Sequence, residues 1–118
     1  MKIVEKEITI GELEEMSGKM FGNLVKAVVD VEKEIMAIDA DLHADEEALL
    51  LEKGSEQKNL WGINIYPEMK GPDFVEFDSM INLRPSQNNR SRGVEDVTIQ
   101  KNILEIVEKL VKKNEQSA

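Results

Sequence analysis

All three arginines of this chain lie within residues 84–93, whereas the other twelve basic residues, spread over the rest of the chain, are lysines. No acidic residue interrupts this segment. A guanidinium group can grip a carboxylate or a phosphate with two parallel hydrogen bonds, which the ammonium group of lysine cannot do. The segment therefore predicts a site for an anionic ligand, with Arg84, Arg90 and Arg92 as the grip.

Several neutral and acidic side chains accompany these arginines. We expect Asn82, Gln87 and Asn89 to orient the ligand, Tyr66 to stack on it, and Asp78 to act as the catalytic acid or base. Loops that lie beside a rigid scaffold often carry binding residues. The alternative is structural: the arginines pair with the abundant acids of the same chain. The sequence leaves both interpretations open.

A second group that could do chemistry is formed by Asp39, Asp41 and His43. A spacing of two places all three on one face of an extended strand. Carboxylates with one imidazole can hold Mg²⁺ or Mn²⁺. The alternative is a solvated strand running into a helix, where Asp41 or His43 serves as a cap.

The absence of cysteine and the single histidine restrict the metal chemistry available to the chain. Structural zinc sites draw mainly on thiolate and imidazole ligands, and the chain has no thiol and one imidazole. We therefore expect no tightly bound transition metal and no cofactor.

Three functions are compatible with these residues. The first is a binding protein or enzyme for a small anionic molecule. The second is a structural or regulatory module, in which the arginine segment meets an acidic patch such as residues 39–47 on a second copy or on a partner. The third is a metal-dependent hydrolase that uses Asp39, Asp41 and Asp78.

Three helices are predicted to support these sites. Thr9 and Glu12 form a capping-box pattern before a helix at 10–20. An acidic first turn opens a short helix at 44–53, followed by Gly54. Asp96 can cap a last helix at 97–113, with lysines near its negative end.

Alternating apolar and polar residues predict two hairpins, with strands at 24–32, 36–42, 60–66 and 75–84. Residues 2–8 are a short strand or an arm. The predicted fold is α+β in the order α-β-β-α-β-β-α, with a four-stranded, mainly antiparallel sheet. The first and last helices are the long pair and cover one face. The following polar residues should then share the opposite face: Lys26, Asp30, Asp39, Asp41, Asn64, Tyr66, Glu76, Asp78, Asn82 and Arg84.

Composition bounds the class of protein. A length of 118 residues fits one domain, which we place at 1–113 with a disordered tail at 114–118. No apolar run could span a membrane, and the first seven residues are too charged for a signal peptide. The formal net charge of −9 disfavours nucleic acid and anionic membranes as partners. We expect a cytoplasmic protein.

Four stretches of the chain, residues 20–30, 43–50, 60–64 and 76–87, resemble a family of small microbial proteins, the domain of unknown function DUF5674. The resemblance extends over nearly the whole chain. It implies membership of a family without an assigned function, and it supplies no activity, cofactor or catalytic residue.

Overall fold

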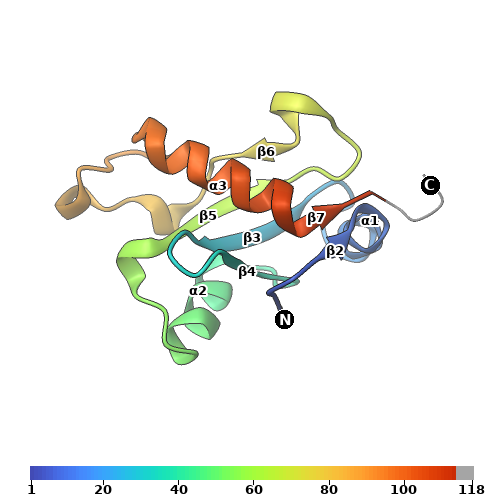
Figure 1. Ribbon diagram of the computed structural model, residues 1–118, viewed down its shortest axis with the longest axis horizontal. Coiled ribbons are helices and arrows are strands. Elements are labelled where there is room, and N and C mark those ends of the chain that lie inside the picture. Colours follow the sequence, from blue (N-terminus) through green and yellow to red (C-terminus); the bar gives the residue numbers. More distant parts are fainter. Residues whose placement is uncertain (114–118) are drawn as a thin grey trace.

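The computed structural model describes residues 1–113, in which three helices and seven strands form a main sheet, a small second sheet and the helices that cover them (Figure 1). The predicted tail at 114–118 lies outside the described residues. The elements, in chain order, are β1 (Lys2–Val4), β2 (Ile8–Thr9), α1 (Ile10–Lys19), β3 (Val25–Asp30), β4 (Ile35–Ile38), α2 (His43–Glu52), β5 (Leu60–Ile65), β6 (Val75–Glu76), α3 (Val97–Leu110) and β7 (Val111–Lys112).

The main sheet is antiparallel throughout, with the strand order β1-β4-β3-β5-β6. The prediction of an α+β fold is confirmed, but the predicted number of four strands is wrong. The fifth strand is β1, which lies along β4 because Val4 is buried opposite Met36. A separate pair joins β2 to β7 in parallel, which the sequence did not predict.

The helix ends follow local capping chemistry. Thr9 accepts a hydrogen bond from the Glu12 amide at 3.1 Å, and the Glu12 carboxylate accepts one from the Thr9 amide at 3.2 Å. This capping box starts α1 as predicted. The carboxylate of Asp96 caps α3, whose helical geometry ends at Leu110 rather than at 113 because the next two residues pair with β2.

Apolar side chains cover both faces of the main sheet. One face packs against residues of α1 and α3, among them Leu13, Ile103 and Leu110. The other face carries a smaller cluster in which Val28 of β3 packs with Leu50 of α2. Figure 1 shows α3 lying across the sheet and α2 on the opposite side. Since α1 and α2 both have ten residues, only α3 is longer than the others.

Two predicted strands end early. The strand predicted at 36–42 stops at Ile38, because Asp39 takes a left-handed backbone conformation with φ of 71°. The strand predicted at 75–84 pairs only at Val75 and Glu76, after which the chain leaves the sheet. The predicted polar face therefore holds for Lys26 and Asp30 of β3, for Asn64 of β5 and for Glu76 of β6. Lys26, Asn64 and Glu76 are in register across these three strands.

Candidate functional site

The segment after β6 seals an open edge of β5. The strand β6 pairs only with Asn64 and Ile65, so the outer edge of β5 near Gly62 has no strand beside it. The Asn82 side chain takes that place: its carbonyl accepts from the Gly62 amide at 2.9 Å, and its amide donates to the Gly62 carbonyl at 3.0 Å. A side-chain amide thus makes the two hydrogen bonds that a neighbouring strand would make, which explains why the predicted strand is short.

Arg84 also binds this edge, and we call Asn82 and Arg84 together the edge seal. The Arg84 side chain is only 8% exposed. Its Nε donates to the Ile81 carbonyl at 2.9 Å, one terminal nitrogen donates to the Gln57 carbonyl at 2.9 Å, and the other donates to the Leu60 carbonyl. Arg84, which the sequence predicted to bind the ligand, therefore donates its hydrogen bonds to backbone carbonyls. No edge of its guanidinium group remains free for a ligand.

Two further contacts hold the Arg84 guanidinium in place. It lies 3.6 Å from the Glu47 carboxylate of α2 and stacks over the Trp61 ring at 4.8 Å. Glu47 belongs to the acidic segment 39–47. The second predicted function had the arginine segment of one copy contact the acidic segment of another copy, but here the two segments contact each other within one chain. The contacts of Arg84 are therefore those of the structural alternative, in which an arginine pairs with an acid of the same chain.

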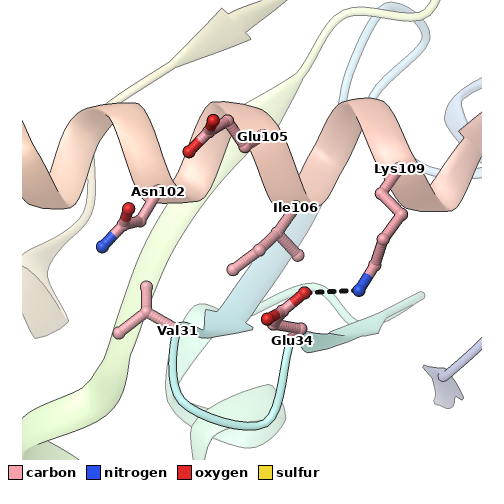
Figure 2. A pocket seen from close by; sticks show the side chains of 6 residues that line it. All are labelled: Val31, Glu34, Asn102, Glu105, Ile106 and Lys109. Carbon is pink, nitrogen blue, oxygen red and sulfur yellow. Dashed lines mark hydrogen bonds and ion pairs between the residues drawn. The ribbon is translucent and has the colours of Figure 1, made fainter.

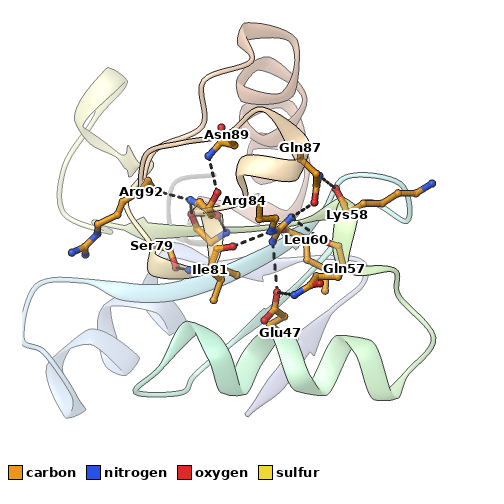
Figure 3. A network of polar contacts seen from close by, with 12 residues as sticks. Glu47, Gln57, Lys58, Leu60, Ser79, Ile81, Arg84, Gln87, Asn89 and Arg92 are labelled. Atoms are coloured by element: carbon orange, nitrogen blue, oxygen red, sulfur yellow. Dashed lines mark hydrogen bonds and ion pairs between the residues drawn. The ribbon is translucent and has the colours of Figure 1, made fainter.

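The amide side chains of the segment also bind the protein itself (Figure 3). Asn89 is buried, donates to the Asn82 and Gly93 carbonyls at 2.8 Å each, and accepts from the Glu95 amide at 2.8 Å. Gln87 donates to the Lys58 carbonyl at 3.2 Å. The side chains predicted to orient a ligand instead orient the loop.

Arg90 and Arg92 differ from Arg84. The Arg92 Nε lies 2.7 Å from an Asp78 carboxylate oxygen, and these side chains are 55% and 41% exposed. Within residues 1–113 the two terminal nitrogens of Arg92 have no protein partner, and the Arg90 guanidinium has none either. The Arg90 backbone amide donates to Glu95 at 2.8 Å. Both arginines therefore keep hydrogen-bond donors that have no partner among the described residues.

Arg92 and Asp78 lie beside a polar row on the face of the sheet that is turned towards α2. The row contains Lys26, Asn64 and Glu76. The Asn64 amide and the Tyr66 hydroxyl both donate to Glu76 Oε1, at 2.9 and 2.8 Å. These hydrogen bonds hold the pKa of Glu76 below its usual range, and the same contact raises the pKa of Tyr66. The other end of the Asn64 amide, Oδ1, is buried without a partner among the described residues.

His43, the first residue of α2, borders this row. Its Nε2 lies 2.7 Å from the Ile63 carbonyl, and a carbonyl only accepts, so Nε2 carries the ring proton. The Nδ1 lone pair has no donor within residues 1–113. Burial lowers the pKa of His43, and the charges of Lys26 and Arg92 lower it further. Asp78 and the Ile63 carbonyl act in the opposite direction.

His43 therefore stands as a neutral base near two cations. We call the group of Lys26, His43, Asn64, Glu76, Asp78 and Arg92 the polar-face site. It unites the predicted residues Asp78 and Arg92, with Tyr66 bound to Glu76 at its border, and residues from β3, α2, β5 and β6. The sequence placed Lys26, Asn64 and Glu76 on one face but did not assign Lys26 or Asn64 to a site.

A buried acid, Glu46, lies one turn after His43 and was not singled out from the sequence. Its side chain is 0% exposed, and burial raises its pKa to about 9. One carboxyl oxygen accepts from the Ala40 amide at 3.2 Å, and the other has no partner among the described residues. A signal existed: Glu46 follows His43 by three residues and precedes Leu50 by four, so it lies on the buried stripe of α2.

The predicted metal group does not form. Asp39 and Asp41 lie beyond the end of β4, so the two-residue spacing that would place them with His43 on one strand face is lost. The described residues contain no cluster of three or more His, Cys, Asp or Glu side chains arranged to hold a metal ion. The third function, a hydrolase built on Asp39, Asp41 and Asp78, loses its geometric basis.

A separate hollow of about 410 Å³ lies between α3 and the β3–β4 turn (Figure 2). Asn102, Glu105 and Lys109 of α3 face Val31 and Glu34 across it. Lys109, the one cation that residues 1–113 contribute to the lining, is paired with Glu34. Among these residues the hollow offers no unpaired positive charge to an anion, unlike the polar-face site.

The comparison with protein families matches one model, described as a protein of unknown function, DUF5674, over residues 2–110. The chain belongs to the DUF5674 family. The match runs from β1 to the last residue of α3, so the DUF5674 region contains both the edge seal and the polar-face site. No curated protein and no solved structure matches the chain. None of the helices described in this DUF5674 protein is long and apolar enough to cross a bilayer.

Proposed function

We propose that the protein binds a small molecule with a phosphate or carboxylate group at the polar-face site. The observation that carries the proposal is the state of Arg92, whose Nε is held by Asp78 while both terminal nitrogens remain without a protein partner among residues 1–113. Those two nitrogens can bind a planar pair of oxygens. Arg92 replaces Arg84 as the main grip.

Lys26 supports the same ligand group. Lys26 and Arg92 come from different segments, yet the positive charges of both lower the pKa of His43, in a chain of net charge −9. The Asp78–Arg92 pair is half exposed, and such pairs contribute only about 0–1 kcal/mol to stability. Asp78 holds the Nε edge of Arg92, and the two terminal nitrogens stay directed away from this contact.

His43 indicates what else the ligand carries. Its Nδ1 is an acceptor without a donor among the described residues, and its tautomer is fixed by the Ile63 carbonyl. A hydroxyl or amine next to the anionic group of the ligand would satisfy it. The favoured class is thus a hydroxy acid, an amino acid or a singly protonated phosphate.

The test is isothermal titration of the protein with inorganic phosphate and with a 2-hydroxy carboxylate at low ionic strength. Arg92→Gln and Lys26→Gln should each weaken binding about tenfold or more, because a charge-assisted hydrogen bond contributes about 1.5–3 kcal/mol. Arg92→Lys should weaken it similarly, since lysine cannot form the fork.

Two matched variants distinguish binding at the polar-face site from general charge attraction and from binding at Arg90. Lys101→Gln removes the same charge from the exposed side of α3 and should leave the affinity unchanged. Arg90→Lys tests the arginine segment as the grip in its own right; a loss there with no loss in Arg92→Gln would move the site to Arg90. The proposal fails if the wild type binds neither anion, or if Lys101→Gln weakens binding as much as Arg92→Gln.

A further inference from the structure

A groove lined by none of the polar-face residues lies between the C-terminal half of α3, the start of α1 and the loop that joins β5 to β6. It has a volume of about 530 Å³, within the range of about 300–1,000 Å³ typical of ligand pockets. Apolar side chains line most of it, among them Ile10, Met69, Phe74, Leu104, Val107 and Val111.

The types of side chain that line the groove favour one kind of ligand. Among residues 1–113, no serine, threonine, asparagine, glutamine or tyrosine lines the groove, so this part of the chain offers no neutral side chain that could orient a polar ring by hydrogen bonds. The charged side chains that the described residues contribute are Lys70, Lys113 and Glu108, an excess of cations in a chain where acids outnumber bases by 24 to 15. An apolar groove whose lining carries two lysines and one glutamate complements a molecule with a long apolar body and an anionic head.

We propose that this groove binds a single alkyl chain with a carboxylate head, as in a medium-chain fatty acid, with Lys70 and Lys113 at the head group. Leu104 is 44% exposed and Met69 is also exposed, so a bound chain would bury apolar surface that now faces water. Met69 has an unbranched, flexible side chain that can adapt to an alkyl chain. At Gly71, a glycine with φ of 62°, an added Cβ would meet no atom within 4 Å, so the wall is open there.

The test is isothermal titration of the whole protein with straight-chain carboxylates of increasing length, each kept below its micelle concentration. Burial of each added methylene should tighten binding about fourfold until the chain fills the groove. The alcohol of equal length should bind severalfold more weakly, and Lys70→Gln with Lys113→Gln should remove this difference.

Leu104→Asp should abolish binding, whereas Val97→Asp, on an exposed position of the same helix outside the groove, should bind like the wild type. Circular dichroism of both variants checks that they are folded. The proposal is overturned if affinity is independent of chain length, or if Leu104→Asp binds as the wild type does. It is also overturned if no carboxylate binds while light scattering finds a dimer that Leu104→Asp alone dissociates, because the groove would then be a contact between two copies.

Discussion

Arg84, Arg90 and Arg92 are identical in type and lie within nine residues, yet their surroundings give them different tasks. Arg84 is buried against three carbonyls and Trp61, whereas Arg92 keeps two terminal nitrogens without a partner in the described chain. The difference follows from position: Arg84 reaches the unpaired edge of β5, and Arg92 reaches the polar face of the same sheet. A guanidinium serves both because it offers five donors in a rigid plane.

Replacement of Arg84 by lysine should destabilise the fold. Lysine cannot reach three diverging carbonyls or stack on Trp61, so buried acceptors lose their donors. We expect the free energy of unfolding of Arg84→Lys to fall by about 2–4 kcal/mol in urea denaturation. Arg92→Lys is the control and should change it by less than about 1 kcal/mol, because the pair with Asp78 is half exposed. Equal stability of the two variants would contradict the structural role of Arg84 at the edge of β5.

Glu46 should make stability depend on pH in an unusual direction. Its pKa is raised in the folded state from 4.5 to about 9, so the folded protein keeps a proton that the unfolded chain releases. The stability lost through this group grows as the pH rises from about 4.5 towards 9, by up to about 1.4 kcal/mol per pH unit. Below pH 4.5 both states are protonated, and the group contributes no difference.

Glu46→Gln removes that linkage while keeping an acceptor for the Ala40 amide. We expect the variant to gain stability relative to the wild type as the pH rises from about 5 to about 8, measured by urea denaturation at several pH values. Other titrating groups, including His43, act on both proteins alike and cancel in the difference. A difference that stays constant with pH would show that Glu46 is ionised in the folded protein.

At the scale of elements, the edge of β5 depends on a side chain rather than on a strand. Asn82→Ala should leave the Gly62 amide and carbonyl buried without partners and should lower the free energy of unfolding by about 2–4 kcal/mol. Asn102→Ala, on the exposed side of α3, should change it by less than about 0.5 kcal/mol. Urea denaturation of both variants checks this, and an Asn82→Ala protein as stable as the Asn102→Ala control would mean that water replaces the side chain at the edge.

The helices were the part of the fold that the sequence predicted best, because their signals are local. Thr9 with Glu12 and the cap at Asp96 fix two helix starts through neighbouring residues alone. The strand at 75–84 was overpredicted for a physical reason: alternation continues past Glu76, but Asn82 and Arg84 bind the β5 edge with side chains instead of backbone. The β5 edge lies about twenty residues earlier in the sequence. The period of apolar residues within 75–84 therefore could not show that side chains, rather than backbone, bind that edge.

At the scale of the whole molecule, the site was predicted in part. Alternation alone brought Lys26, Asn64 and Glu76 to one face, since that depends only on strand register. It could not show that Arg84 turns inward while Arg92 pairs with Asp78, because both follow from the path of a loop. That the ligand is an anion stays a prediction. The residues proposed to bind it are now those of the polar-face site instead of the arginine segment.

The parallel contact of β2 with β7 places Ile8 beside Val111. During synthesis the hairpin of β3 and β4 and then β5 can pair early, but β2 must wait for residues made about a hundred positions later. Until α3 emerges, the part of the apolar sheet face that packs against Ile103 and Leu110 is not covered by that helix. The long-range contact between β2 and β7 therefore forms late in the folding of the nascent chain, and the apolar surface exposed until then is prone to aggregation.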